Sequence, residues 1–416
     1  MRNLLRVVLL VSILASGTLI AAPVTATSVV ASSASPGALA PDLSPIPGPC
    51  VDGALASGGL SRICVPANGW NGDLIVYAHG YVAFNEPLDF ANLTLPDGTY
   101  LPDLVQSLGY AFATTSYRRN GLAILEGVDD VRELVAKFAD DVVPPRKTYI
   151  TGPSEGGAVS ALSAERSADI FDAGLSLCGP IGNFRKQIDY WGDFRVLYDV
   201  FFPGVLPGDA LHVPPELIAG WETVYQPLVL AKLAADPVGT AQLLRTSRAP
   251  IDPADLTTAG ATTAGVLWYN VFATEDGKQQ FGGNPFDNTT RVYRGSLDDL
   301  ALNAAVDRFA ADPAALAKLK QYETTGNPAI PLVTMHTVGD PIVPYWHQTQ
   351  YRAKARSNGN TGVTSILIRR YGHCAFTTTE VLAGFGLMVL KATGQPMYVP
   401  ERYDVAGVRA LERSAE

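Results

Sequence analysis

The sequence predicts an α/β protein with a mostly parallel sheet that helices cover on both faces. Short apolar runs rich in β-branched and aromatic residues alternate with segments whose apolar residues recur at helical spacing, and this alternation is typical of parallel sheets. A chain of 416 residues that is 47% hydrophobic can also bury a large core. One connection between two predicted strands is far longer than a crossover needs, which indicates an insertion.

Residues 1–26 are expected to be a secretory signal peptide. Arg2 and Arg6 precede an apolar run that extends from Val7 to about Ala22, and the small residues that follow this run suit cleavage near Ala26. A membrane anchor is the alternative, but the run is shorter than the roughly 20 residues that a span needs. Residues 27–49 are rich in Ser, Ala and Pro and predict a flexible leader. We therefore expect a secreted or periplasmic protein.

The charge balance argues against several classes of partner. The chain has 31 Lys and Arg against 40 Asp and Glu, a net charge of −9, and removal of the signal makes it more acidic. Because it has no basic run, it is a poor candidate for binding nucleic acid or an anionic membrane surface. No later segment resembles an integral membrane anchor, and the sequence leaves the oligomeric state open.

Four cysteines in an oxidising compartment are expected to form disulfides. Cys50 and Cys64 are close in the sequence and are predicted to pair, which would stabilise the N-terminal segment by about 3 kcal/mol. Cys178 and Cys374 are then left for each other, with two unpaired thiols as the alternative.

Six strands are predicted, with helices between most of them, for example over residues 123–142 and 155–171. The predicted strands are LIVYA (74–78), YAFATTSY (110–117), KTYIT (147–151), AGLSLC (173–178), PLVTMHT (331–337) and TSILIRR (364–370).

Residues 183–327 are predicted to form a helical cap, inserted after the fourth of these strands. Residues 255–280 have the pattern of a long helix, and Asp312-Pro313 is a typical helix start. Residues 50–182 and 328–416 are expected to form the sheet domain around this insertion.

Ser154 lies in the segment Gly152-Pro153-Ser154-Glu155-Gly156, between a predicted strand and a predicted helix. Small residues two positions to either side let strand and helix approach closely, and a sharp turn there exposes the serine oxygen at the helix N-terminus. A capping serine in a glycine-rich turn is the alternative. The strand and helix on either side favour a nucleophile.

A nucleophilic serine needs a base and a carboxylate that orients the base. His373 follows the last predicted strand in a short loop, and Asp340 follows the strand at 331–337. Both therefore lie at the carboxyl edge of the sheet, where catalytic groups gather in open α/β sheets. The alternatives are His336 and His347 for the base, and Asp189 and Asp193 for the acid.

These pieces resemble the α/β-hydrolase superfamily over roughly residues 60–182 and 328–395. The similar motifs are Tyr77-Ala78-His79-Gly80-Tyr81, Gly152-Pro153-Ser154-Glu155-Gly156, Gly339-Asp340-Pro341-Ile342-Val343-Pro344 and Gly372-His373. The chain order of serine, aspartate and histidine is also the order of that fold. The resemblance implies an α/β-hydrolase fold, a serine nucleophile and an acyl-enzyme mechanism, but the fold serves esters, amides, peptides and lactones alike.

The resemblance further implies an oxyanion hole made by the backbone N–H groups of Tyr81 and Glu155. The Glu155 side chain is expected to be an orienting or solvated carboxylate, and His79 is expected to hold its loop by a hydrogen bond. For the substrate pocket we expect the ring of Tyr81 and, from the aromatic-rich cap, Trp191 and Trp268.

His373-Cys374 is similar to the His-Cys pair of tannases and fungal feruloyl esterases. In those enzymes the cysteine is bridged to another that directly precedes the nucleophilic serine. This chain departs from that pattern, because Pro153 precedes Ser154.

The sequence therefore predicts a secreted serine hydrolase that cleaves a small or polymeric carboxylic ester with an aromatic or apolar moiety. No cofactor or metal is expected, because no His, Cys and Asp cluster has ligand spacing and no glycine-rich phosphate loop occurs. One alternative is an amidase or peptidase with the same three residues. Another is a secreted binding protein that keeps the fold without catalysis.

Overall fold

The computed structural model describes residues 44–397 of the chain. The predicted signal peptide, most of the predicted leader and the C-terminal residues 398–416 lie outside this range. Within it, Ile46 pairs with Asn68 as an isolated β-bridge, and the Gly48 N–H donates a hydrogen bond to the side chain of Gln106 at 2.8 Å. The end of the predicted leader is thus attached to the folded domain. None of the helices in residues 44–397 has the length and apolar character of a membrane span.

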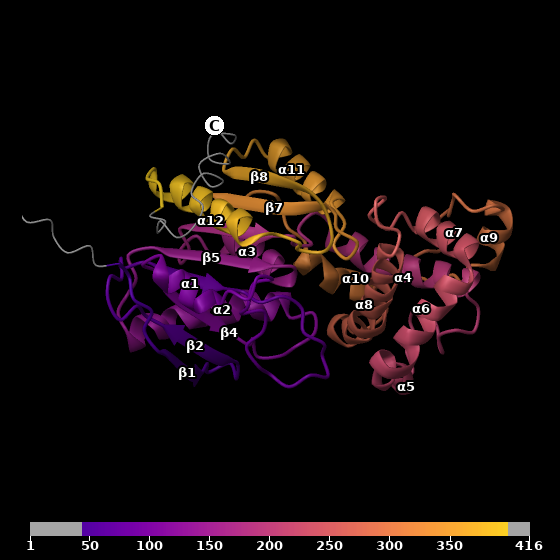
Figure 1. Ribbon diagram of the computed structural model, residues 1–416, viewed down its shortest axis with the longest axis horizontal. Coiled ribbons are helices and arrows are strands. Elements are labelled where there is room, and N and C mark those ends of the chain that lie inside the picture. Colours follow the sequence, from indigo (N-terminus) through magenta and orange to yellow (C-terminus); the bar gives the residue numbers. More distant parts are fainter. Residues whose placement is uncertain (1–43, 398–416) are drawn as a thin grey trace, which may run out of the picture. The chain divides into compact units, whose positions relative to one another are not determined.

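Eight strands form one sheet in the order β1-β2-β4-β3-β5-β6-β7-β8 (Figure 1). Strand β2 is antiparallel to both of its neighbours, and every pair from β4 to β8 is parallel. The strands are β1 (Cys50–Ala54), β2 (Leu60–Cys64), β3 (Leu74–Tyr77), β4 (Ala111–Thr115), β5 (Thr148–Pro153), β6 (Ala173–Leu177), β7 (Leu332–Gly339) and β8 (Val363–Tyr371).

The helices fall into those that flank the sheet and those that are inserted between β6 and β7. The flanking helices are α1 (Leu101–Ser107), α2 (Ile124–Asp141), α3 (Glu155–Arg166), α11 (Trp346–Ser357) and α12 (Thr378–Thr393). The inserted elements are α4 (Phe184–Phe201), α5 (Pro215–Ala219), the π-helix η1 (Trp221–Tyr225), α6 (Gln226–Ala235), α7 (Pro237–Ser247), α8 (Thr258–Phe281), α9 (Asp299–Ala305), α10 (Pro313–Leu319) and the 3₁₀-helix η2 (Lys320–Tyr322).

Alternate side chains of the strands face opposite layers, as the two-residue period of a strand requires. On β3, Leu74 and Val76 belong to the apolar cluster that includes residues of α2 and α3. Ile75 and Tyr77 belong to the cluster on the other face, with residues of α1 and α12. The sheet is therefore covered on both faces, as predicted.

The first two strands were not predicted from the sequence. They form a hairpin in which Cys50 lies directly opposite Cys64, and a disulfide joins the two residues, as the cysteine pattern had suggested. Strand β1 lies at the edge of the sheet with four of its five residues exposed, so it lacks the alternation of apolar and polar residues that reveals a half-buried strand.

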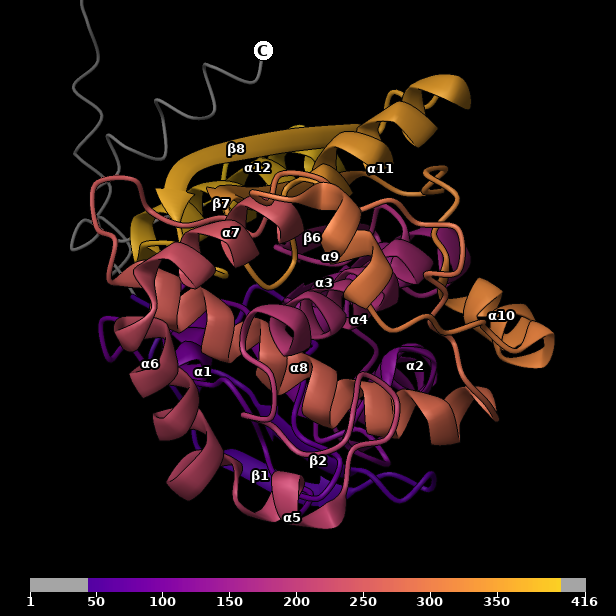
Figure 2. The same ribbon diagram turned by 90° about the vertical axis from the view of Figure 1, so that its right-hand side faces the viewer.

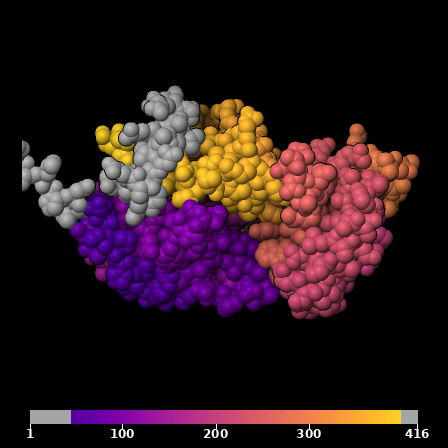
Figure 3. All heavy atoms as spheres, in the orientation of Figure 1, coloured from indigo at the N-terminus to yellow at the C-terminus, as the bar shows by residue number. Residues whose placement is uncertain are grey.

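The cap, defined as residues 183–327, meets the sheet domain at the carboxyl edge of the strands (Figure 1), and Figure 3 shows its atoms packed against those of the sheet domain. The Gln187 side chain donates to the Ile342 carbonyl at 2.9 Å, and the Tyr190 hydroxyl donates to the Pro341 carbonyl at 2.8 Å. Within the cap, the long helix α8 packs against α4 and α6 (Figure 2). This architecture confirms the predicted fold class, an α/β-hydrolase fold with a large helical insertion before the strand that leads to Asp340.

Candidate active site

Ser154 is the only residue between β5 and α3, so the chain turns sharply there. Its backbone has φ 55° and ψ −120°, a left-handed conformation that is rare for a residue with a side chain. A Cβ atom at Gly152 or Gly156 would lie 2.1 or 2.0 Å from the carbonyl oxygen of Ala78. Both positions therefore need glycine, and their small size permits the turn that presents the serine oxygen.

The structure brings Ser154, His373 and Asp340 together from the ends of three different strands. His373 Nε2 lies 2.8 Å from Ser154 Oγ, and His373 Nδ1 lies 2.8 Å from Asp340 Oδ2. An ionised carboxylate only accepts hydrogen bonds, so Nδ1 carries the proton and Nε2 accepts from the serine. The other oxygen of Asp340 accepts from the N–H groups of Ile342 and Val343, each at 2.9 Å.

The two alternative bases make hydrogen bonds away from Ser154. His336 Nε2 donates to the Val343 carbonyl at 2.7 Å. His347 Nδ1 accepts from the Gly182 N–H at 2.9 Å, and its Nε2 donates to Gln187 at 2.7 Å. Burial lowers the pKa of both imidazoles. Both histidines are therefore neutral structural residues in this arrangement.

The two alternative acids, Asp189 and Asp193, bind an arginine inside the cap. Asp189 pairs with Arg291 at 2.9 Å, and Asp193 pairs with the same guanidinium and accepts from the Tyr293 hydroxyl at 2.6 Å. Burial raises the pKa of Asp193 to about 6, although Arg291 opposes the shift. Their partners mark these carboxylates as part of the internal structure of the cap.

The loop after β3 lies against Ser154 and offers a free backbone donor. The Gly80 N–H donates to the Asn92 side chain at 3.0 Å, and a Cβ at Gly80 would lie 3.5 Å from that of Ser154. The Tyr81 N–H donates no hydrogen bond to another described residue, and the Glu155 N–H, at the first position of α3, has no acceptor within its own helix. The role of these two groups as oxyanion donors stays a prediction.

His79 holds this same loop. Its Nδ1 donates to the Gly80 carbonyl at 2.6 Å, and its ring stacks on that of Tyr117 with the centroids 4.0 Å apart. Burial lowers the pKa of His79. It makes no hydrogen bond with Ser154, Asp340 or His373, in keeping with the structural role expected for it.

The Glu155 side chain is buried, which corrects the expectation of an orienting or solvated carboxylate. Only 5% of the residue is exposed, and its Oε1 finds no hydrogen-bond partner among the described residues. Burial, reinforced by the nearby charge of Asp276, raises the pKa of Glu155 well above its usual range. Burial thus favours the neutral acid, and only the backbone of this residue is offered to the site.

Ser154 and His373 line a cavity of about 310 Å³ together with Tyr81 and Tyr269. The rest of its wall is mainly apolar and includes Leu95, Pro96, Leu101, Leu177, Phe376 and Val381. A cavity of this size and character suits a small aromatic or aliphatic group placed next to the serine.

Of the three residues predicted to bind substrate, only Tyr81 lines this cavity. The cap residue that lines it is Tyr269, which was not among the residues predicted from the sequence. Trp191 stacks on Tyr269 with the centroids 5.1 Å apart, and Trp268 meets it edge to face at 5.0 Å. The two tryptophans therefore support the lining residue. The sequence shows the adjacent aromatic residues at 268 and 269, but it does not show which of the two rings faces the cavity.

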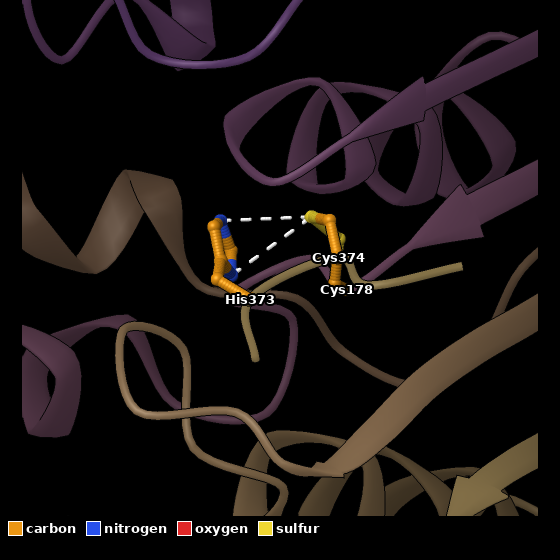
Figure 4. Close-up of side chains that lie close together, drawn as sticks. All are labelled: Cys178, His373 and Cys374. Atoms are coloured by element: carbon orange, nitrogen blue, oxygen red, sulfur yellow. Dashed lines mark hydrogen bonds between the residues drawn. A yellow bond between two sulfur atoms is a disulfide. The ribbon is translucent and has the colours of Figure 1, made fainter. Parts of the chain in front are cut away.

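A disulfide between Cys178 and Cys374 borders the site, as expected. Figure 4 shows the bridge beside the His373 ring, and Cys374 Sγ is 3.6 Å from Nε2. The bridge ties the loop after β8 to the end of β6. Among the described residues, His373 and these two cysteines also form the one group with metal-ligand distances, but the disulfide removes the thiolates that would bind a metal.

A larger cavity of about 710 Å³ lies within the cap, between α6, α7 and the start of α8. None of the residues predicted for the site lines it. The candidate site is therefore identified by the chemistry of its side chains and not by cavity size.

No family model and no curated protein sequence matches this chain. Several solved structures are similar to it. The Pyrococcus horikoshii acylaminoacyl peptidase is 13% identical, and the match covers 88% of this chain and 44% of that chain with a TM-score of 0.44. Feruloyl esterase B from Aspergillus oryzae is 14% identical, with 83% of this chain and 80% of that chain covered and a TM-score of 0.42. A Pyrococcus furiosus esterase is 13% identical, with 88% of this chain and 97% of that chain covered and a TM-score of 0.42. The chain spans less than half of the length of the acylaminoacyl peptidase.

Proposed function

We propose that this protein is a secreted serine hydrolase that cleaves a carboxylic ester with an aromatic or apolar moiety. The observation that carries the proposal is the continuous hydrogen-bonded series of Ser154, His373 and Asp340 at the wall of an apolar cavity. A serine hydroxyl at a left-handed turn, an imidazole and a buried carboxylate in this order have the geometry needed for acyl transfer.

In the proposed reaction, His373 Nε2 takes the proton of Ser154 as Oγ attacks the ester carbonyl. Asp340 stabilises the resulting imidazolium, and the N–H groups of Tyr81 and Glu155 hold the carbonyl oxygen as it gains charge. The tetrahedral intermediate collapses, and the alcohol leaves with the proton from His373. Water then attacks the acyl-enzyme with His373 as base, which releases the acid and restores Ser154.

Two observations support the finer parts of the proposal. The wall of aliphatic and aromatic side chains favours an apolar group on the substrate. The two disulfides favour an oxidising compartment, because thiols stay reduced in the cytosol of most organisms.

The test is labelling of the purified protein with a fluorophosphonate, followed by location of the adduct by peptide mass spectrometry. We expect the adduct on Ser154. We expect Ser154→Ala to form no adduct, and its kcat on aryl esters to be about 10⁶-fold lower than that of wild type. Ser160→Ala is a matched control, because Ser160 lies in α3, the helix that begins directly after Ser154, and its hydroxyl donates to the Gly156 carbonyl at 2.7 Å.

The outcomes separate the competing functions. A matched ester and amide pair distinguishes an esterase from an amidase or peptidase with the same residues. Well-folded wild-type protein that neither takes up the probe nor cleaves either substrate would contradict the proposal and favour a binding protein.

A further inference from the structure

Tyr269 is the cap residue that lines the cavity beside Ser154. It lies on α8, and Ser154 and His373 line the same cavity. The backbone donors of the expected oxyanion hole come from the sheet domain, so Tyr269 brings a polar group to the site from a separate part of the fold.

The Tyr269 ring is held by aromatic neighbours on three sides. Trp191 stacks on it nearly parallel, at 18° and 5.1 Å between centroids. Trp268 lies edge to face at 5.0 Å, and Tyr81 is tilted against it at 5.5 Å. A ring fixed in this way holds its hydroxyl in one place before substrate arrives, and such preorganised donors contribute most to catalysis.

We propose that Tyr269 is a catalytic residue whose phenol donates a third hydrogen bond to the substrate oxygen that gains negative charge when Ser154 attacks. This inference rests on the proposed function. The phenol keeps its proton throughout, so the step adds a hydrogen bond and changes no other part of the reaction.

The surroundings keep this phenol a donor. Burial raises the pKa of Tyr269 above its ordinary value, and the nearby Asp340 acts in the same direction. The O–H group therefore remains protonated at neutral and mildly alkaline pH.

Helix α8 also contacts the end of β8, two residues before His373. The hydroxyls of Thr262 and Tyr371 lie 2.8 Å apart, and the Tyr371 hydroxyl donates to the Thr258 carbonyl at 3.3 Å. One helix of the cap thus places Tyr269 and supports the strand end that leads to His373, so the site is complete only with the cap in place.

The first test is Tyr269→Phe, which removes the hydroxyl and keeps the stacked ring. We expect kcat on an aryl ester to fall about 100-fold, with KM within about threefold of wild type because ground-state binding is retained. Tyr198→Phe is the matched control. Tyr198 is a buried cap tyrosine on α4 that stacks on Phe202 at 5.1 Å, and we expect its loss to leave kcat unchanged.

A second readout separates catalysis from structure. An aryl trifluoromethyl ketone adds to the serine as a hemiketal with a charged oxygen, so its affinity should fall in Tyr269→Phe in parallel with kcat/KM. If Ser154→Ala is inactive while Tyr269→Phe keeps kcat and ketone affinity within about twofold of wild type, the proposed function stands and the role of Tyr269 is overturned. If wild-type protein neither hydrolyses esters nor takes up a fluorophosphonate, the proposed function fails and this inference fails with it.

Discussion

Two buried carboxyl groups near Ser154 differ in how their charge is compensated. Asp340 accepts hydrogen bonds from two backbone N–H groups and from His373, whereas Glu155 Oε1 has no donor within the described residues. Burying an ionised carboxylate is costly unless donors surround it. The two carboxyl groups therefore suit different tasks, because Asp340 orients His373 and Glu155 fills buried space as a neutral acid.

Glu155 should make the free energy of unfolding depend on pH. Its pKa in the folded state is raised above the unfolded value of 4.5, so its contribution is fully present below pH 4.5 and is lost as the pH rises through the folded-state pKa. Glutamine at this position does not titrate. The free energy of unfolding of Glu155→Gln should therefore rise relative to that of wild type by up to about 1.4 kcal/mol for each pH unit between 4.5 and the folded-state pKa.

Urea unfolding at pH 5, 7 and 9 measures this gain. Glu222→Gln removes an exposed glutamate of the cap and serves as the control, with a difference from wild type that does not vary with pH. A flat difference for Glu155→Gln as well would contradict the prediction.

At the scale of the elements, the two disulfides connect different kinds of structure. The Cys50–Cys64 bridge joins the two strands of an edge hairpin. The Cys178–Cys374 bridge joins the end of β6 to the loop that carries His373. Only the second bridge holds a group that the proposed reaction needs.

Removing each bridge separately should therefore affect different quantities. Cys178→Ala with Cys374→Ala frees the histidine loop, and we expect kcat to fall roughly 10- to 100-fold, because a displacement of about 1 Å is costly in catalysis. Cys50→Ala with Cys64→Ala should lower the free energy of unfolding by about 2–4 kcal/mol and leave kcat within about twofold of wild type. Steady-state kinetics and urea unfolding of both variants test this, and equal loss of kcat in the two would contradict it.

At the scale of the whole described domain, buried polar contacts hold the cap on the sheet domain. Gln187 in the cap bonds to His347 and to the Ile342 carbonyl of the sheet domain. Asp276 of α8 pairs with Arg119 at 2.5 Å. Because these groups lose water on docking, separation of the two parts would leave them without partners or require water to enter.

His347 should make this junction sensitive to acid. Burial lowers its pKa well below the ordinary 6.5, so its contribution is complete above pH 6.5 and is lost as the pH falls below that value, where the unfolded chain binds a proton and the folded chain does not. His347→Gln should lower the free energy of unfolding at pH 7.5 by about 1–3 kcal/mol. The deficit should shrink by up to about 1.4 kcal/mol per pH unit below pH 6.5.

Urea unfolding at pH 7.5 and 5.5 measures the change in that deficit. His212→Gln is the control, because His212 lies in the cap with 76% of its side chain exposed. A deficit for His347→Gln that stays constant or grows on acidification would show that the histidine is not kept neutral by the fold.

The sequence by itself determined the alternation of strands and helices, and it placed Ser154, Asp340 and His373 after three strands. These predictions are local, and parallel strands bring their carboxyl ends to one edge, so the three residues had to lie near one another. It also indicated the two cysteine pairs. The exposed strand β1 escaped detection because an edge strand carries little periodicity.

Only the tertiary structure decided which aromatic residue of the cap faces the site. Trp268 and Tyr269 are neighbours on α8, and successive residues of a helix point about 100° apart. Which of the two rings points inward depends on how α8 is rotated where it packs against α4 and where Trp191 stacks on Tyr269. That rotation is set by contacts between segments far apart in the chain, which no local pattern records.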